Sequence, residues 1–178
     1  MQKSSIILLL VSLIIFYSCS ENDNNKMFTL LPPKTTGVKF KNILRETEDF
    51  NVLQYGYLYN GGGVAVGDVN NDGLPDIYFT GNMVGSHLYI NQGDFEFKEV
   101  GKKAGVFAEG LWNTGATMVD INADGFLDIY VCRSAAKDAA KRKNLLFINN
   151  GDLTFTEKAS EYGIDDSGYS TQGTFFDY

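Results

Sequence analysis

The sequence is constrained most by an internal repeat. Residues 68–78, DVNNDGLPDIY, return about 50 residues later as residues 120–130, DINADGFLDIY. Further along each copy, LYINQGDFEF at 88–97 is matched by LFINNGDLTF at 146–155. A third copy starts at residues 170–177, which align with 113–120, and the sequence stops one residue later. We therefore expect a stack of similar units that continues into a longer protein.

Each repeat predicts four short β-strands separated by turn residues. The expected strands of the two copies lie at 63–67, 76–80, 87–91, 95–98 and at 116–119, 129–132, 145–148, 153–156. The 19 glycines against 3 prolines suit many strands and tight turns. The second copy is longer by six residues, which fall within the segment 133–144, and this segment predicts an exposed loop or short helix. Four antiparallel strands per unit are typical of a propeller blade, so we predict an all-β, partial β-propeller with two full blades and the start of a third.

The two Asp-rich segments, 68–76 and 120–128, are called the first and second Asp loop. Both follow the pattern Asp-x-Asn-x-Asp-Gly-x-x-Asp, which places side-chain oxygens at positions 1, 3, 5 and 9, with a backbone carbonyl at position 7. Calcium takes six to eight hard oxygen ligands in flexible geometry, which this spacing can supply. The expected ligands are Asp68, Asn70, Asp72, Leu74 and Asp76, then Asp120, Asn122, Asp124, Phe126 and Asp128, with Asp177 opening a third loop.

Two other interpretations of the Asp loops were weighed. An EF-hand needs a glutamate at position 12, but Phe79 and Val131 stand there, and the flanking segments are strand-like. Asp, Asn and Gly also cluster in turns that bind no metal. Two loops with equal spacing and the start of a third favour calcium over simple turn chemistry. The net charge of −7 argues against nucleic acid as a partner.

The N-terminus predicts export. Lys3 is followed by a short apolar run that ends at Cys19, so residues 1–18 are typical of a signal peptide. Cys19 is the expected lipidation site, and an ordinary secretory signal with an incidental cysteine is the alternative. Residues 19–45 are then a polar tether and lead-in, and residues 46–178 form the blades. This organisation predicts a lipid anchor at the bacterial outer membrane or cell surface.

The repeats resemble FG-GAP/VCBS repeats, the calcium-loop blades of integrin-α-type propellers. The resemblance covers roughly residues 61–178 and is carried by GVAVGD before the first Asp loop and DIY after each loop. It implies that the loop joins the first two strands of a blade and binds Ca²⁺. The segments around 97–106 and 155–164 further resemble the ASPIC/UnbV-associated group. No FG-GAP dipeptide is evident, and the ASPIC/UnbV C-terminal module is absent from this stretch.

No set of residues forms a recognisable catalytic constellation, and the single histidine, His87, disfavours a histidine-based triad. We therefore expect a non-enzymatic, calcium-binding scaffold that contacts an extracellular protein or a glycan. The alternative is the propeller portion of a larger secreted carbohydrate-active or hydrolytic enzyme, whose catalytic residues would lie outside this chain.

Overall fold

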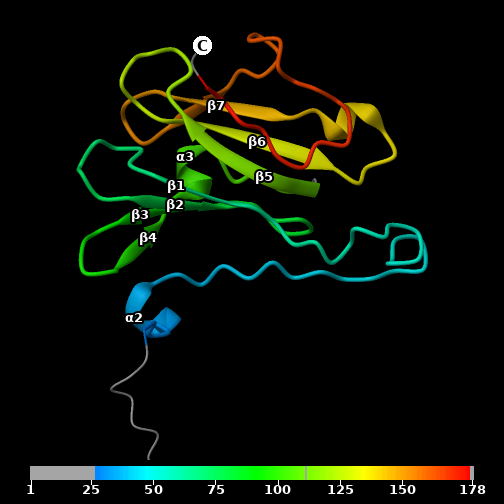
Figure 1. Cartoon of the computed structure of the whole chain (residues 1–178), viewed down its shortest axis with the longest axis horizontal. Coiled ribbons are helices and arrows are strands. Elements are labelled where there is room, and N and C mark those ends of the chain that lie inside the picture. The colour runs from blue at the N-terminus through cyan, green and yellow to red at the C-terminus, as the bar shows by residue number, and fades with distance from the viewer. Residues whose placement is uncertain (1–26, 111, 177–178) are drawn as a thin grey trace, which may run out of the picture. The chain divides into compact units, whose positions relative to one another are not determined.

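The computed structural model describes residues 27–110 and 112–176. The elements below all lie in the unit formed by residues 32–178. Two four-stranded antiparallel sheets dominate it, each with its strands in chain order (Figure 1). The first sheet consists of β1 (Val64–Gly67), β2 (Asp76–Phe79), β3 (His87–Asn91) and β4 (Phe97–Glu99). The second consists of β5 (Trp112–Val119), β6 (Asp128–Ser134), β7 (Leu145–Asn149) and β8 (Phe155–Glu157).

Within residues 27–110 and 112–176, the sheets are accompanied by three short helices: α2 (Pro33–Thr36), α3 (Gly101–Ala104) and the 3₁₀-helix η2 (Ala139–Arg142). The helix η2 lies in the exposed insertion of the second repeat, where the sequence predicts a loop or short helix. Its N-terminus is capped by the Asp138 carboxylate, which accepts a hydrogen bond from the Ala140 N–H. In the described part of the chain, no helix has the length and apolar character needed to span a bilayer.

The strand register repeats from one sheet to the other. Tyr78 lies opposite Leu88 in the first sheet, and Tyr130 lies opposite Leu146 in the second. Each of these tyrosine hydroxyls donates to a carbonyl of the connector that leaves its sheet, Val106 at 2.7 Å and Ile164 at 3.0 Å. The all-β prediction with four antiparallel strands per repeat is therefore confirmed, and the described residues do not close into a ring.

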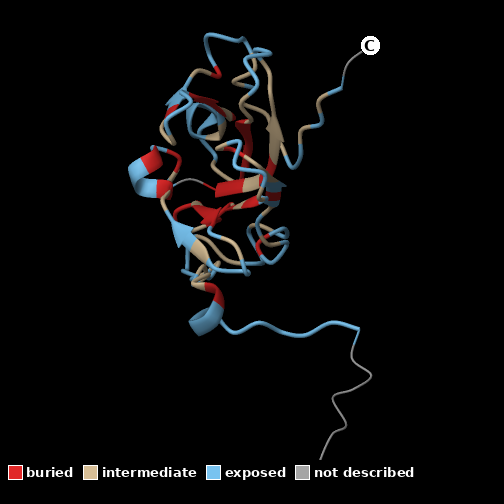
Figure 2. Cartoon of the chain, turned by 90° about the vertical axis from the view of Figure 1, so that its left-hand side faces the viewer, coloured by how far each residue is buried: buried red, intermediate tan, exposed pale blue. Residues whose placement is uncertain are grey.

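The main core lies between the two sheets. Alternate side chains of the first sheet pack against alternate side chains of the second, as the period of two in a strand requires. The buried members of this cluster include Tyr78, Leu88, Ile90, Ile129, Val131 and Phe147. Figure 2 shows buried residues concentrated on the strands.

The other face of each sheet is also covered in part. On the second sheet, Tyr130 and Cys132 point away from the main core and pack near Phe175 of the third copy. On the first sheet, the lead-in residue Phe40 stacks on Phe79 with ring centroids 5.1 Å apart. The Tyr89 hydroxyl also accepts a hydrogen bond from the Lys39 N–H. Strands buried on both faces explain why every residue of β6 is buried.

One backbone contact repeats between the first strands of successive copies. The Gly63 N–H donates to the Thr114 carbonyl at 2.8 Å, and the Gly115 N–H donates to the Thr171 carbonyl at 2.9 Å. A Cβ atom at Gly63 would lie 2.7 Å from the Thr114 oxygen, and one at Gly115 would lie 2.5 Å from the Thr171 oxygen. These approaches are too close for any side chain, so both positions require glycine.

Several strand predictions are corrected by the structure. β5 starts four residues earlier than predicted and β6 ends two residues later, because the two strands continue to pair beyond an irregularity between Asn113 and Ala116. β4 and β8 start two residues later than predicted, because Phe95 and Leu153 have left-handed φ angles of 59° and 63° and belong to the turns. Residues 170–176, the start of the third copy, run beside β5 without forming a strand, unlike the segment of the second copy with which they align. A ladder needs successive backbone bonds, and in this segment the backbone bond to β5 is the one at Gly115.

Candidate functional site

The first Asp loop joins β1 to β2, and its ends are fixed by the pairing of Gly67 with Asp76. The Asp68 carboxylate accepts hydrogen bonds from the N–H groups of Asp72 and Gly73, at 3.2 and 2.7 Å. The Asp72 carboxylate accepts one from the Leu74 N–H at 2.8 Å. These bonds fold the backbone around the acidic side chains. The loop is therefore tight, and its carboxylate oxygens belong to a single turn of the chain.

The second Asp loop joins β5 to β6 and repeats this arrangement bond for bond. The Asp120 carboxylate accepts from the N–H groups of Asp124 and Gly125, at 3.1 and 2.9 Å. The Asp124 carboxylate accepts from the Phe126 N–H at 2.9 Å. The position-3 amides also correspond, because Asn70 donates to Asp72 and Asn122 donates to Asp124, both at 2.8 Å.

The last acidic residue of each loop is buried at the start of the following strand. Asp76 accepts hydrogen bonds from the N–H groups of Val69 and Asn91, at 3.0 and 2.8 Å. Asp128 accepts from Ile121 and Asn149 at 3.1 and 2.8 Å. Burial raises the pKa of both carboxyls, and the backbone N–H donors oppose that rise by favouring the charged form.

The backbone of both loops turns through two left-handed residues. Gly73 and Gly125 at position 6 have φ angles of 84° and 89°, a conformation that glycine adopts readily. Asn71 and Ala123 at position 4 have φ angles of 58° and 57°, which the sequence analysis missed. Asparagine tolerates this conformation and offers a weak signal, whereas alanine offers none.

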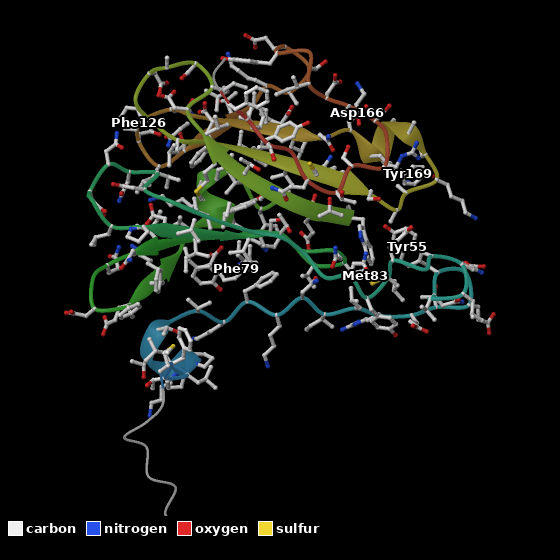
Figure 3. All side chains as sticks on the ribbon, viewed as in Figure 1. Tyr55, Phe79, Met83, Phe126, Asp166 and Tyr169 are labelled. Atoms are coloured by element: carbon white, nitrogen blue, oxygen red, sulfur yellow. The ribbon has the colours of Figure 1, made fainter. Side chains whose placement is uncertain are left out.

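The two Asp loops contact each other. The Asn71 side chain donates to the Gly125 carbonyl at 2.9 Å. Beneath them, the buried Asn149 side chain donates to the Val69 carbonyl at 2.8 Å. Both loops lie at the same end of the sheets, where Figure 3 labels Phe126. The sequence gives no sign of this contact, since the residues involved are far apart in the chain.

The donor set of each loop fits calcium in chemical type. It consists of carboxylate, amide and backbone oxygens, with no nitrogen or sulfur ligand, as a hard cation prefers. The carboxylates of positions 1 and 5 also accept hydrogen bonds from loop N–H groups. Over residues 27–110 and 112–176, no three acidic, histidine or cysteine side chains are gathered as a metal-ligand cluster. Asp177 and the lipidation residue Cys19 lie outside the described residues.

The other residues with potentially reactive side chains, Cys132 and His87, lie in the packed interior or at the surface of a sheet. Cys132 is buried on β6, and burial raises the pKa of its thiol to about 11. His87 contacts the Glu99 carboxylate at 3.0 Å on the surface of the first sheet. Neither group adjoins the Asp loops.

The comparison with known families agrees with the loop geometry. Residues 68–131 match the FG-GAP-like repeat family. The match starts at the first residue of the first Asp loop and ends inside β6, so that it includes both Asp loops and the first sheet from β2 onward. None of the curated proteins matches the chain. The ASPIC/UnbV association stays a prediction.

Proposed function

We propose that the protein is a calcium-stabilised, non-enzymatic binding scaffold, lipid-anchored at the bacterial envelope. The observation that carries the calcium assignment is the bond-for-bond repetition of two nine-position Asp loops at one end of neighbouring sheets. A turn that served only to reverse the chain would not need four oxygen-bearing side chains in the same order twice. The FG-GAP-like match supports a propeller-type scaffold.

Each loop would hold one Ca²⁺ through oxygens at positions 1, 3, 5, 7 and 9. In the first loop these come from Asp68, Asn70, Asp72, the Leu74 carbonyl and Asp76; in the second they come from Asp120, Asn122, Asp124, the Phe126 carbonyl and Asp128. Asp177 would begin the same set in a third loop. The bound ion would draw the loop carboxylates together and neutralise them, and would hold the first two strands of each blade in register.

The expected effect on stability follows from mass action. A ligand that binds only the folded state stabilises it by about 2.7 kcal/mol when its concentration is a hundred times its dissociation constant. Residues 1–18 and Cys19 support export, which would place the loops in a compartment where calcium is available. The partner proposed for such a scaffold is an extracellular protein or a glycan.

The test is calorimetric titration of Ca²⁺ into the full chain, with thermal unfolding measured in calcium and in chelator. We expect saturable binding and a higher Tm in calcium. Asp72→Ala and Asp124→Ala should each remove one site. The matched control is Asp49→Ala, which removes an exposed carboxylate outside both loops.

Equal melting temperatures in calcium and chelator, with no heat of binding, would show that the Asp loops are turns that bind no calcium. If the Asp49→Ala control loses as much calcium binding as the loop variants, calcium binding depends on the overall negative charge and not on the Asp loops.

A further inference from the structure

A cavity of about 810 Å³ lies at the end of the sheets opposite to the Asp loops. Its lining comes from the start of β5, the end of β6 and the glycine-rich segment that precedes β1. Figure 3 shows Tyr55 and Tyr169 at this end and Phe126 at the other. Its volume is within the range of about 300–1,000 Å³ that is typical of small-ligand sites.

Aromatic rings of fixed orientation form much of the cavity wall. The Trp112 ring, only 7% exposed, packs edge-on against Phe50 and Tyr55, with centroids 5.4 Å apart in both pairs. The Tyr55 hydroxyl lies 3.3 Å from the Ser134 hydroxyl, and its ring contacts Tyr57. Trp112 and Tyr55 are therefore held by their neighbours, whereas Tyr57 is 67% exposed.

Tyr169, the residue just before the third copy, faces the same cavity. Its ring is 64% exposed, and the Arg142 guanidinium lies 4.2 Å from the ring centroid. Arg142 is itself held, because it donates to the carbonyls of Ser167 and Ala136 at 3.0 and 2.6 Å. This contact orients Tyr169 through a residue that does not itself line the cavity.

The polar part of the lining is neutral. It consists of the amides of Gln54, Asn60 and Gln172 and the hydroxyls of Thr114, Ser134 and Thr171. Among the described residues that line the cavity, none carries a charge at neutral pH. A charged ligand would lose its hydration here without gaining an ionic partner. A wholly apolar ligand would leave the amides and hydroxyls unpaired.

We propose that this cavity binds a neutral saccharide unit of a glycan. A pyranose ring has one face of polarised C–H groups, which suits the negative faces of tyrosine and tryptophan rings. Its hydroxyl groups both donate and accept, and so match amides and hydroxyls of the wall. This inference rests on the proposed binding-scaffold function and names its ligand class and its site, at the end of the sheets remote from the calcium loops.

Trp112 is the single tryptophan of the chain and reports directly on the cavity. The full chain, purified in a detergent whose headgroup is not a sugar, is titrated with four probes while tryptophan fluorescence is recorded. Three probes are neutral, namely tetramers of N-acetylglucosamine, mannose and glucose, and a galacturonic acid tetramer is the acidic comparison. We expect a saturable change in Trp112 emission with at least one neutral probe and none with the acidic one.

Matched variants locate the binding. Tyr57→Ala and Tyr169→Ala should each weaken it by about tenfold, since each removes an exposed ring from the wall. Tyr59→Ala is the control, because Tyr59 is similarly exposed at 64% and lies two residues from Tyr57, but does not line the cavity. Affinity unchanged in the two cavity variants would place the ligand elsewhere and overturn the proposal.

The same preparation separates this inference from the calcium proposal. Calcium binding without any saccharide response overturns the cavity assignment and leaves the calcium loops standing. Saccharide binding without calcium binding does the reverse. A response confined to the acidic probe overturns the neutral-ligand assignment.

Discussion

The contact between the Asp loops leads to a prediction that does not depend on metal. Asn71 and Ala123 occupy the same position of the repeat and have the same left-handed φ angle, 58° and 57°. Only Asn71 reaches across, donating to the Gly125 carbonyl. Replacing each by glycine keeps the backbone conformation. A comparison of the two variants therefore isolates the contribution of the Asn71 side chain to stability.

The expected changes have opposite signs. Asn71→Gly loses a hydrogen bond, with a net value of about 0.5–1.5 kcal/mol, and adds flexibility to the unfolded chain at about 0.4–1 kcal/mol. Asparagine is little strained in this conformation, so its replacement by glycine relieves little backbone strain. We expect a loss of about 1–2 kcal/mol in the free energy of unfolding.

For Ala123→Gly the balance is reversed. The left-handed conformation costs an L-residue about 1–2 kcal/mol, which glycine relieves. This gain exceeds or equals the entropy that glycine adds to the unfolded state. We therefore expect this variant to be neutral or more stable by up to about 1 kcal/mol.

The assay is thermal unfolding of both variants and the parent chain in chelator. In a chain of this size, 1 kcal/mol corresponds to about 2–4 °C in Tm. Asn71→Gly should melt about 2–8 °C below the parent, and Ala123→Gly at or above it. Equal shifts in the two variants would refute the reasoning, because the side-chain bridge would then contribute nothing.

Two more predictions concern the packing between copies and the buried thiol. Gly115→Ala should lower the free energy of unfolding in urea by about 1–3 kcal/mol, since its Cβ would meet the Thr171 oxygen at 2.5 Å, while Gly56→Ala, with no atom within 4 Å, should stay within about 0.5 kcal/mol of the parent. Similar losses in both would contradict the steric argument. The raised pKa of Cys132 means that the unfolded chain loses this proton first, so stability should fall as the pH rises from about 9 to about 11, by about 2–3 kcal/mol. In Cys132→Ala this part of the pH dependence should be missing from urea midpoints over the same range, and identical pH profiles would contradict it.

Much of the fold could be predicted because it is encoded locally and twice. The loop glycines, the alternation along each strand and the turn residues all specify one repeat, and the second copy confirms the first. β4 and β8 were placed two residues early because Phe95 and Leu153 are apolar, and strand-like residues in a turn give no sequence signal. Lead-in residues such as Phe40, which covers the first sheet, also escaped prediction, because a single aromatic residue does not indicate what it will contact.

The cavity and the loop contact depend on how one repeat is placed against the next, which the repeat period does not specify. Trp112 and Tyr55 are ordinary aromatic residues in the sequence and form one wall only after β5 has packed beside the segment before β1. That packing is set by the close approach at Gly63 and repeated at Gly115. β1 and β5 each run from the cavity end to an Asp loop, so that each strand connects the two proposed sites. In the proposed scaffold, calcium would stabilise the sheets from one end, and the other end would stay open to a ligand.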